Sequence, residues 1–553
     1  VQGYKPVSEL PSRGVFFEQT AITKNEADGT VTISVDISPA PTARVTIPIT
    51  FAGTAVKGRN YSATQTSLVF DPNDASQTRD ITLKLIDNAV DDVADKTVII
   101  RLGAPTPVTQ AYAIPGKDVA TLTIADDDHK PVIASVQNFI SGKVGTGYSY
   151  QIQATGATRY TVTGLPAGMT YNATTGLIEG RPTVAGEYDQ IWITAINAAG
   201  VSTSTGYYVK VEDFSPVARG NFVGFVDRAG AGTSALGARI DLNITKAAEF
   251  TGKLTVGTTA YPLNGKLDTS TTNPTGSKTY VRGGITYTVA FTIDTGTGAL
   301  TGTIGAAVIS GWKAQTETLL SGLHNFITER AGGPITGDPH GASYGTATVA
   351  ATGSVAATIH TSDGAVFATS APVGSDGQVL VYQTAYTTVG SLLGNLTIAN
   401  DGPHTLGGAL TWSRPVQSSG GWATEIPLAV KGGKYRPVSG SAIVMNLASG
   451  VANNASLQFE DGGLVDPITV SFRISAPTLV TIPAPYKLTV TNSTGAFSGS
   501  FKKGAADVPF QGVIVPTTAT ADPFDGRGNG YFLTPGTSSV VIRSGLVSLD
   551  PVL

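Results

Sequence analysis

The sequence predicts an all-β protein in which two β-sandwiches precede a large antiparallel β-meander or barrel region with internal hairpin repeats. The 553 residues exceed what one hydrophobic core normally holds, so three or four domains are expected. Only 14% of the residues are charged, and the chain is rich in Thr, Ser, Ala, Val and Gly. β-Branched residues suit pleated strands and glycine suits turns. Apolar and polar residues also alternate, which is typical of half-buried strands.

The alternation is clear near the N-terminus. Residues 30–37 place Val31, Ile33, Val35 and Ile37 on one face and polar side chains on the other. The same pattern recurs in residues 44–49, 80–86, 97–102 and 120–124. Short strands separated by Gly, Pro and Asp predict a β-sandwich.

Residues from about 14 to 128 resemble a Calx-β domain. The motifs that carry the resemblance are residues 17–18, 25–31, 53–61, 87–95 and 124–128. Their order and spacing cover the whole domain. The resemblance implies an Ig-like β-sandwich with a Ca²⁺ site at one end.

The chemistry of this site also follows from the residues. Ca²⁺ takes six to eight oxygen ligands, and carboxylates on neighbouring loops supply them well. Asn60 replaces the Asp that is usual in the family, and Lys96 stands where a second Glu is common, so affinity is lowered. Either the acids bind Ca²⁺, the one cofactor considered, or they are solvated loop and turn residues. The candidate ligands are Glu26, Asp91, Asp92, Asp95, Asp126, Asp127 and Asp128.

A second domain begins after Pro131, which favours a short stiff linker because proline cannot pair in a central strand. Turn residues recur at fixed offsets between alternating strands in residues 164–171, 174–182, 185–188 and 195–200. With these motifs, residues from about 131 to 211 resemble the Putative Ig family of bacterial surface proteins. The resemblance implies a second Ig-like sandwich that acts as a spacer.

The rest of the chain shows internal repetition. Residues 248–254 are echoed by residues 495–501, and Gly265 and Gly512 follow at the same offset. Residues 298–304 echo the first half of the unit. Each unit predicts a hairpin, and hairpins bury a face only when they stack side by side. We expect one large barrel or two related β domains, with these boundaries: tail 1–13, sandwiches 14–130 and 131–213, barrel-like parts 214–340 and 341–553.

Charge and composition restrict the partners and the compartment. The net charge of −4 and the absence of a Lys/Arg stripe exclude a nucleic-acid partner. The chain has no Cys, which excludes disulfides and thiolate chemistry. No apolar run reaches the ~18 residues of a transmembrane segment. The chain begins at Val1, and we expect a mature protein secreted to the cell surface or extracellular matrix of a bacterium.

Catalytic patterns are scarce, so we expect no enzyme, and an extracellular hydrolase is the least favoured function. None of the five His residues has metal-ligand spacing. Ser343 lies in a GxSxG string, but a Gly/Pro-rich loop precedes it and a strand pattern follows, unlike a nucleophile elbow. A glycosidase-type hydrolase needs two carboxylates in one cleft. The candidates for such a pair lie in stretches with no other catalytic motif: Glu329, Asp338, Glu425 and Glu460.

Two alternatives concern partners. Trp422 lies in a Ser/Gly-rich loop and is the one aromatic residue that we assign to ligand binding. Sugar binding by this residue would make the protein a lectin-like carbohydrate-binding protein. The alternative is core packing, which is the usual role of aromatic residues in β domains. The strand-like tail 539–549 would either extend a neighbour's sheet and build filaments, or complete its own barrel, which we favour. We expect a structural or adhesive protein that binds itself, as a homo-oligomer or filament, or binds other surface proteins or glycans.

Overall fold

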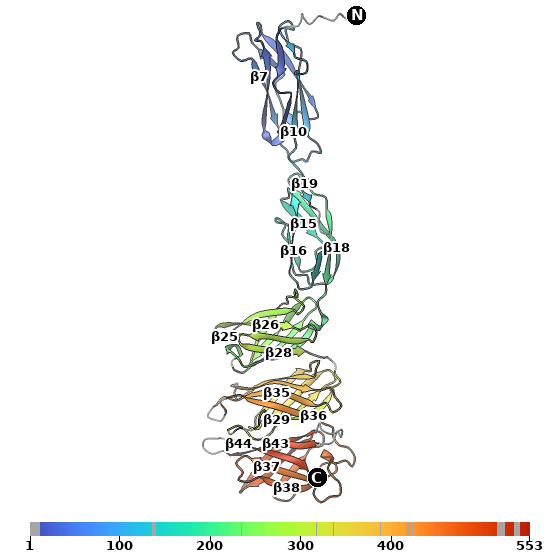
Figure 1. Cartoon of the computed structure of the whole chain (residues 1–553), viewed down its shortest axis with the longest axis vertical. Coiled ribbons are helices and arrows are strands. Elements are labelled where there is room, and N and C mark those ends of the chain that lie inside the picture. Colours follow the sequence, from blue (N-terminus) through green and yellow to red (C-terminus); the bar gives the residue numbers. More distant parts are fainter. Residues whose placement is uncertain are drawn as a thin grey trace. The chain divides into compact units, whose positions relative to one another are not determined.

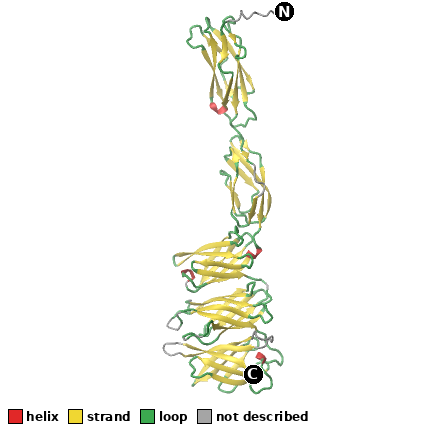
Figure 2. Cartoon of the chain, in the orientation of Figure 1, coloured by secondary structure: helices red, strands yellow, loops and turns green. Residues whose placement is uncertain are grey.

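The computed structural model describes residues 12–134, 140–233, 235–316, 318–333, 335, 337–387, 389–416, 421–422, 424–516, 526–535 and 542–552. These residues confirm the all-β prediction, since strands make up each domain (Figure 2). The named helices are short 3₁₀ turns, and no described helix is long and apolar enough to cross a membrane. Residues 1–11 of the expected tail lie outside the described part. The four turns are η2 (Glu26–Asp28), η3 (Pro216–Ala218), η4 (Ala231–Thr233) and η5 (Val444–Asn446).

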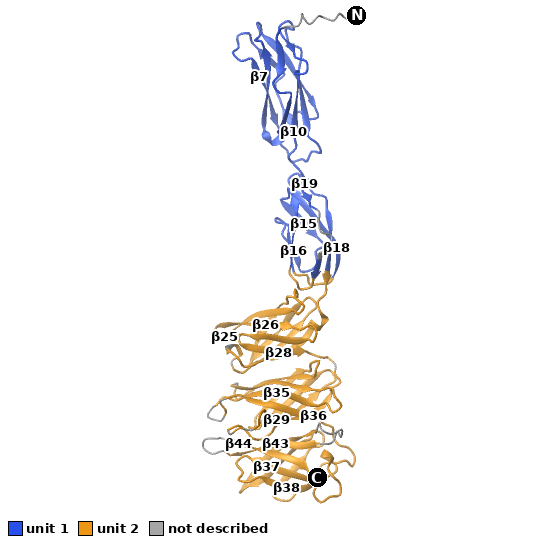
Figure 3. Ribbon diagram, in the orientation of Figure 1, with its two compact units in different colours: residues 1–142, 148–180, 186–210 blue, residues 143–147, 181–185, 211–553 orange. Residues whose placement is uncertain are grey.

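The chain divides into two compact units, coloured separately in Figure 3. Unit 1 comprises residues 1–142, 148–180 and 186–210, and it holds both sandwiches. Unit 2 comprises residues 143–147, 181–185 and 211–553.

The first sandwich packs two five-stranded sheets, ordered β5-β7-β3-β1-β9 and β2-β10-β8-β4-β6, around one apolar core. Val31, Ile33, Val35 and Ile37 all lie in that core, as the alternation predicts. The strands are β1 (Gly14–Phe17), β2 (Ala21–Asn25), β3 (Thr30–Ser38), β4 (Val45–Gly53), β5 (Tyr61–Ser62), β6 (Ser67–Phe70), β7 (Thr78–Leu85), β8 (Lys96–Leu102), β9 (Tyr112–Ala113) and β10 (Val119–Ala125).

The second sandwich is smaller and has its own core, in which Tyr160, Ile191 and Ile193 are buried. Its larger sheet includes the order β12-β20-β18-β15, and its smaller one the order β13-β17-β16. The strands are β11 (Val132–Ile133), β12 (Ile140–Lys143), β13 (Tyr148–Gln151), β14 (Ala154–Thr155), β15 (Arg159–Thr163), β16 (Met169–Tyr171), β17 (Leu177–Gly180), β18 (Gly186–Asn197), β19 (Gly200–Val201) and β20 (Thr205–Glu212).

The remaining chain forms three eight-stranded antiparallel sheets, named barrels 1, 2 and 3 here and coloured from green to red in Figure 1. Barrel 1 comprises β21 (Gly220–Val226), β22 (Ala238–Ile244), β23 (Glu249–Val256), β24 (Thr259–Lys266), β25 (Thr275–Arg282), β26 (Ile285–Ile293), β27 (Ala299–Ile304) and β28 (Ala307–Lys313). Barrel 2 comprises β29 (Gly322–Arg330), β30 (Ser343–Val349), β31 (Ser354–His360), β32 (Val366–Pro372), β33 (Gln378–Ala385), β34 (Gly390–Ile398), β35 (Leu406–Ser413) and β36 (Ile426–Lys434). Barrel 3 comprises β37 (Ala455–Asp461), β38 (Ile468–Ser475), β39 (Leu479–Thr481), β40 (Lys487–Val490), β41 (Ala496–Lys503), β42 (Ala506–Pro516), β43 (Gly526–Pro535) and β44 (Ile542–Pro551).

Each barrel joins two meanders through its first and last strands, which pair as β21·β28, β29·β36 and β37·β44. The two meanders have four strands each in barrels 1 and 2, and three and five strands in barrel 3. The division therefore differs from the expected boundary between residues 340 and 341. That position lies between β29 and β30, two paired strands of barrel 2. Its Gly- and Pro-rich sequence belongs to a hairpin loop, which has the same turn composition as a linker.

The sequence echoes have a structural cause. Phe250 lies opposite Gly265 across a hairpin, and Phe497 lies opposite Gly512 in the same way. A Cβ on either glycine would overlap the phenyl ring, so the ring covers the space that glycine leaves. The equal offset of Gly265 and Gly512 in the two sequence repeats is therefore the number of residues between each phenylalanine and the glycine opposite it in the hairpin. Similar pairs are Phe291–Gly276, Phe326–Gly345, Phe510–Gly499 and Phe532–Gly545.

Barrels 1 and 2 are joined by a buried arginine. The Arg228 side chain is 6% exposed and pairs with the Glu425 carboxylate, with Nη1 and Oε2 2.6 Å apart. Its other guanidinium nitrogens donate to the hydroxyl and carbonyl oxygens of Ser391, and both Nη atoms donate to Thr411. Beside it, Val223 and Trp312 of barrel 1 pack against Leu380 of barrel 2.

Barrels 2 and 3 meet in a comparable way. Asn325 is fully buried, and its Nδ2 donates to the carbonyl oxygens of Thr494 (2.8 Å) and Ile514 (3.0 Å). An apolar cluster shared by the two barrels includes Tyr344 and Tyr531, together with Val513 and Val515 on either side of Ile514. The same construction, a buried polar anchor beside apolar side chains, therefore joins each pair of consecutive barrels.

The C-terminal strand β44 is fully integrated, since it pairs with β43 on one side and with β37 on the other. Val547 and Leu549 are completely buried in the core of barrel 3. The tail therefore completes its own barrel, and its described part has no free edge to offer a neighbouring chain. Residues 539–541 of the predicted tail lie outside the described part.

Deleting residues 539–553 should unfold barrel 3, because β37 and β43 lose their shared partner and the core loses two buried aliphatic side chains. We expect rapid proteolysis confined to residues 440–538, measured by limited digestion and mass spectrometry. A protease-resistant barrel 3 in the truncated protein would contradict this role of β44.

Barrel 2 contains a buried histidine whose ring makes no hydrogen bond to the described residues. His324 is fully buried, and its ring stacks on that of His404 at a centroid distance of 5.9 Å. Neither of its ring nitrogens has a hydrogen-bond partner among the described residues. Burial, aided by the neighbouring charges of His404 and Lys434, lowers the pKa of His324 to about 4.

We therefore expect the free energy of unfolding of barrel 2 to fall as the pH drops from 6.5 towards 4. In the unfolded state the His324 imidazole is protonated below pH 6.5, whereas in the folded state it is protonated only below about pH 4. Between these pH values the free energy of unfolding falls by up to about 3 kcal/mol, at about 1.4 kcal/mol per unit of pKa difference. Tryptophan fluorescence during urea unfolding at several pH values measures this loss, because Trp412 and Trp422 both lie in barrel 2. A His324→Leu variant serves as the control, and an unchanged pH dependence in this variant would contradict the assignment.

Candidate metal site

The acidic residues of the first sandwich converge because of its strand order. β2 and β10 are parallel neighbours with Asn25 opposite Ala125, so Glu26 and residues 126–128 leave the sheet together. β8 pairs with β10 and begins opposite Ile124, which brings the β7–β8 loop to the same end. Three acidic segments that are far apart in the sequence therefore meet at one pole.

Four carboxylates form the tighter group, named the acidic cluster here: Glu26, Asp87, Asp127 and Asp128. One oxygen from each lies within 4.8 Å of the others. Asp87 was absent from the candidate ligands, although its position just after β7 was a usable signal. The structure thus brings together three of the seven sequence candidates and adds one residue.

The other candidates lie apart from this cluster. Asp91 and Asp126 form a second group with His129, but the Lys130 ammonium lies 3.7 Å from Asp91. Asp92 pairs with Lys96 at 3.4 Å and belongs to neither group. Asp95 is exposed and also belongs to neither. Protein cations therefore already neutralise part of this second acidic region.

Glu26 shows the strongest electrostatic perturbation of the site. It is 4% exposed, and Asn88 donates a 2.7 Å hydrogen bond to Oε2, while Oε1 has no partner among the described residues. Burial, then the negative charge of Asp126, raises the pKa of Glu26 to about 7. Oδ2 of Asp128 is likewise buried without a partner. Without a cation, the folded domain holds carboxylates that repel one another.

The two departures from the family pattern have local explanations. Asn60 is 3% exposed, and its side-chain oxygen accepts a hydrogen bond from the Val56 backbone N–H at 2.9 Å. It therefore stabilises a turn. Lys96 is held by Asp92, outside the acidic cluster.

The donor set of the acidic cluster fits a hard divalent cation. Carboxylate oxygens are the ligands that Ca²⁺ prefers, and two buried oxygens here lack any other partner. A bound Ca²⁺ would supply the positive charge that offsets the repulsion, and it would lower the pKa of Glu26.

Trp422 lies against the core of barrel 2. Its ring meets that of Trp412 edge to face at a centroid distance of 4.4 Å, and its Nε1 donates to the Trp412 carbonyl oxygen at 3.4 Å. It is half-buried, which favours a packing role. Part of its loop, residues 417–420 and 423, lies outside the described residues.

The groups considered for catalysis are dispersed. Ser343 opens a strand, with no helix after it, and its hydroxyl contacts that of Ser362. Three of the four acids pair with separate cations: Glu329 with Lys431, Asp338 with Arg330 and Glu425 with Arg228. In the described part of the chain, these carboxylates do not form a catalytic pair.

Comparisons with known proteins agree with this domain order. Residues 12–128 match the Calx-beta domain model, and residues 130–212 match the Putative Ig domain model. The apo-form Calx CBD1 domain aligns with 23% identity over 21% of this chain and 98% of its own length, with a TM-score of 0.19.

Two tandem structures also align. The calcium binding domain CBD12 of CALX1.1 does so with 16% identity over 36% of this chain and 99% of its own, with a TM-score of 0.22. Three titin Ig domains do so with 15% identity over 46% of this chain and 97% of their own, with a TM-score of 0.17. No curated protein sequence matches the chain. The chain thus carries a Calx-beta domain followed by a Putative Ig domain, ahead of three barrels without an assigned family.

Proposed function

We propose that this chain is a structural or adhesive protein of a bacterial cell surface or extracellular matrix, and that it is not an enzyme. The Calx-beta and Ig-like domains indicate an extracellular or surface β-sandwich protein. The observation that carries the structural role is the way the barrels are joined, by buried polar anchors and apolar side chains. Such contacts keep modules in a fixed register, as a load-bearing or presenting protein requires.

The first sandwich is the calcium-dependent part of this proposal. Its acidic cluster binds one Ca²⁺ through Glu26, Asp87, Asp127 and Asp128, and two buried oxygens without partners support this assignment. Lys130 and Lys96 neutralise the neighbouring Asp91 and Asp92, which supports one ion there rather than several.

The partners of this protein are glycans, other surface proteins or further copies of the chain. β44 completes barrel 3, so self-association requires a surface other than this C-terminal strand. The dispersion of the candidate catalytic groups supports a binding role over hydrolysis.

We expect a Glu26→Gln substitution to have two opposite effects at pH 7. Without Ca²⁺ it should stabilise the first sandwich by up to about 3 kcal/mol, because the wild-type pKa is raised from 4.5 to about 7 and apo stability is lost as the pH rises through that range. It should also weaken or abolish the stabilisation by Ca²⁺, which is about 2.7 kcal/mol for wild type at 100 times Kd. Hydrogen exchange of β2 and β10 in the full chain measures both effects.

Asp95→Asn is the matched control, since Asp95 lies in the same acidic loop but outside the cluster. This variant should respond to Ca²⁺ as the wild type does. Equal loss of the calcium response in both variants would show diffuse charge neutralisation in place of a site.

The structural role is tested first by light scattering of the full chain with and without millimolar Ca²⁺, and by antibody labelling of intact source cells. We expect surface labelling and either a defined oligomer or a monomer that retains all five modules. Hydrolysis of an extracellular polymer by the purified chain would overturn the non-catalytic assignment.

A further inference from the structure

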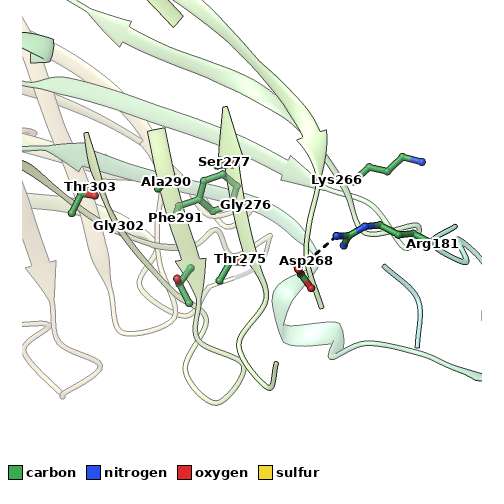
Figure 4. Close-up of a pocket in the computed structure, with 11 residues that line it drawn as sticks. Arg181, Lys266, Asp268, Thr275, Gly276, Ser277, Ala290, Phe291, Gly302 and Thr303 are labelled. Carbon is green, nitrogen blue, oxygen red and sulfur yellow. Dashed lines mark ion pairs between the residues drawn. The ribbon is translucent and has the colours of Figure 1, made fainter. Parts of the chain in front are cut away.

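Barrel 1 has an open depression of about 580 Å³ on the outer face of β25, β26 and β27. Figure 4 shows the charged side chains Arg181, Lys266 and Asp268 gathered at one side, and Thr303 at the other. All these residues belong to unit 2. The remaining lining is Thr275, Gly276, Ser277, Ala290, Phe291, Thr292 and Gly302.

The same face is covered in the other two barrels. In barrel 2, Ser391 of the sixth strand donates to the Leu236 carbonyl oxygen of barrel 1, at 2.7 Å. In barrel 3, Ile514 of the sixth strand accepts from Asn325 of barrel 2. The sixth strand of barrel 1 is β26, whose outward Ala290 is exposed.

The side chains on these faces differ in chemistry. Leu380 and Tyr382 of barrel 2, and Val513 and Tyr531 of barrel 3, are buried on the covered faces. On barrel 1, residues with hydroxyl groups lie opposite one another on neighbouring strands, in place of these buried side chains. Thr275 lies opposite Thr292, which lies opposite Thr301, and the next row contains Ser277, Ala290 and Thr303.

The charged side of the depression is held in place by the backbone. Arg181 donates from Nη1 to the Gly145 carbonyl oxygen at 2.6 Å, and its Nη2 lies 3.6 Å from Asp268 Oδ2. Asp268 exchanges backbone hydrogen bonds with Thr275. The backbone N–H of Ser270, aided by the Arg181 charge, holds the pKa of Asp268 below its usual value. A carboxylate acceptor and a guanidinium donor are therefore fixed side by side.

We propose that this depression binds a saccharide chain, an inference that rests on the proposed function because it assigns a site to glycans, one of the partner classes named there. Each sugar hydroxyl both donates and accepts hydrogen bonds, and the lining matches it with cationic donors, a carboxylate acceptor and hydroxyls that do both. Small residues such as Ala290 leave the strand surface open, so the C–H faces of a sugar can approach it. Because the depression is open and crosses three strands, it fits a segment of an extended chain.

Binding of hexasaccharides to the full chain tests the proposal, with cellohexaose, xylohexaose, mannohexaose, chitohexaose and hexagalacturonate as probes in isothermal titration calorimetry. We expect saturable binding of at least one probe. Asp268→Asn should weaken this binding at least tenfold, and so should the double variant S277A/T303A. Asp268→Asn preserves side-chain size at a half-exposed position, and S277A/T303A only shortens two exposed side chains, so the fold should persist, as circular dichroism will verify.

Thr279→Ala and Lys253→Gln are matched controls, since both residues are exposed on strands of the same sheet but do not line the depression. These variants should bind as the wild type does. Failure of all five probes to bind, or equal binding by the control and depression variants, would overturn the proposal. The result is independent of surface location and of the calcium response, so its failure leaves the structural role intact.

Discussion

The pairing of the first strand with the last is the constraint on which each barrel depends. A four-stranded meander such as β21–β24 has one apolar face and cannot bury it alone. The β21·β28 ladder brings the second meander against it, so that residues from both halves, such as Phe250 and Phe291, meet at a centroid distance of 5.1 Å. Because this contact closes a long loop, it forms only when most of the barrel sequence is present. The same requirement recurs at β29·β36 and β37·β44.

Joining the barrels requires a second kind of interaction. A buried arginine such as Arg228 would be strongly destabilising without partners, because its charge leaves water. Hydrogen bonds that Arg228 donates to Ser391 and Thr411, together with the charge of Glu425, offset that cost only in one arrangement of barrels 1 and 2. The fully buried Asn325 likewise donates both Nδ2 hydrogen bonds to barrel 3, while its Oδ1 has no partner among the described residues. Apolar contacts supply attraction between barrels, whereas these polar anchors determine their register.

The acidic cluster of the first sandwich shows the opposite arrangement, because its carboxylates pair with no cation among the described residues. The cluster lies at the end of strands whose cores are fully packed, so the scaffold tolerates the repulsion. Such a site gains stability from a cation rather than from protein partners. The hydroxyl-lined depression of barrel 1 is different again, since fixed and satisfied groups surround an open surface. Different modules thus have different roles. The first sandwich is stabilised by an ion, the contacts between barrels fix their register, and the outer face of barrel 1 offers a recognition surface.

The sequence by itself determined the local structure, because strand alternation and turn residues act over a few positions. It placed Val31, Ile33, Val35 and Ile37 in a core, located both sandwiches and identified five of the six acids that form the two groups at one pole of the first. It also revealed the Phe–Gly hairpin spacing, since both partners lie in one hairpin. Only the tertiary structure decided the rest. The number of barrels depends on ladders such as β21·β28, and the ligand set depends on which loops share a pole, so that Asp87 joined the cluster while Asp95 did not. These choices arise from contacts between distant segments, and no local pattern encodes which distant strand will be the partner.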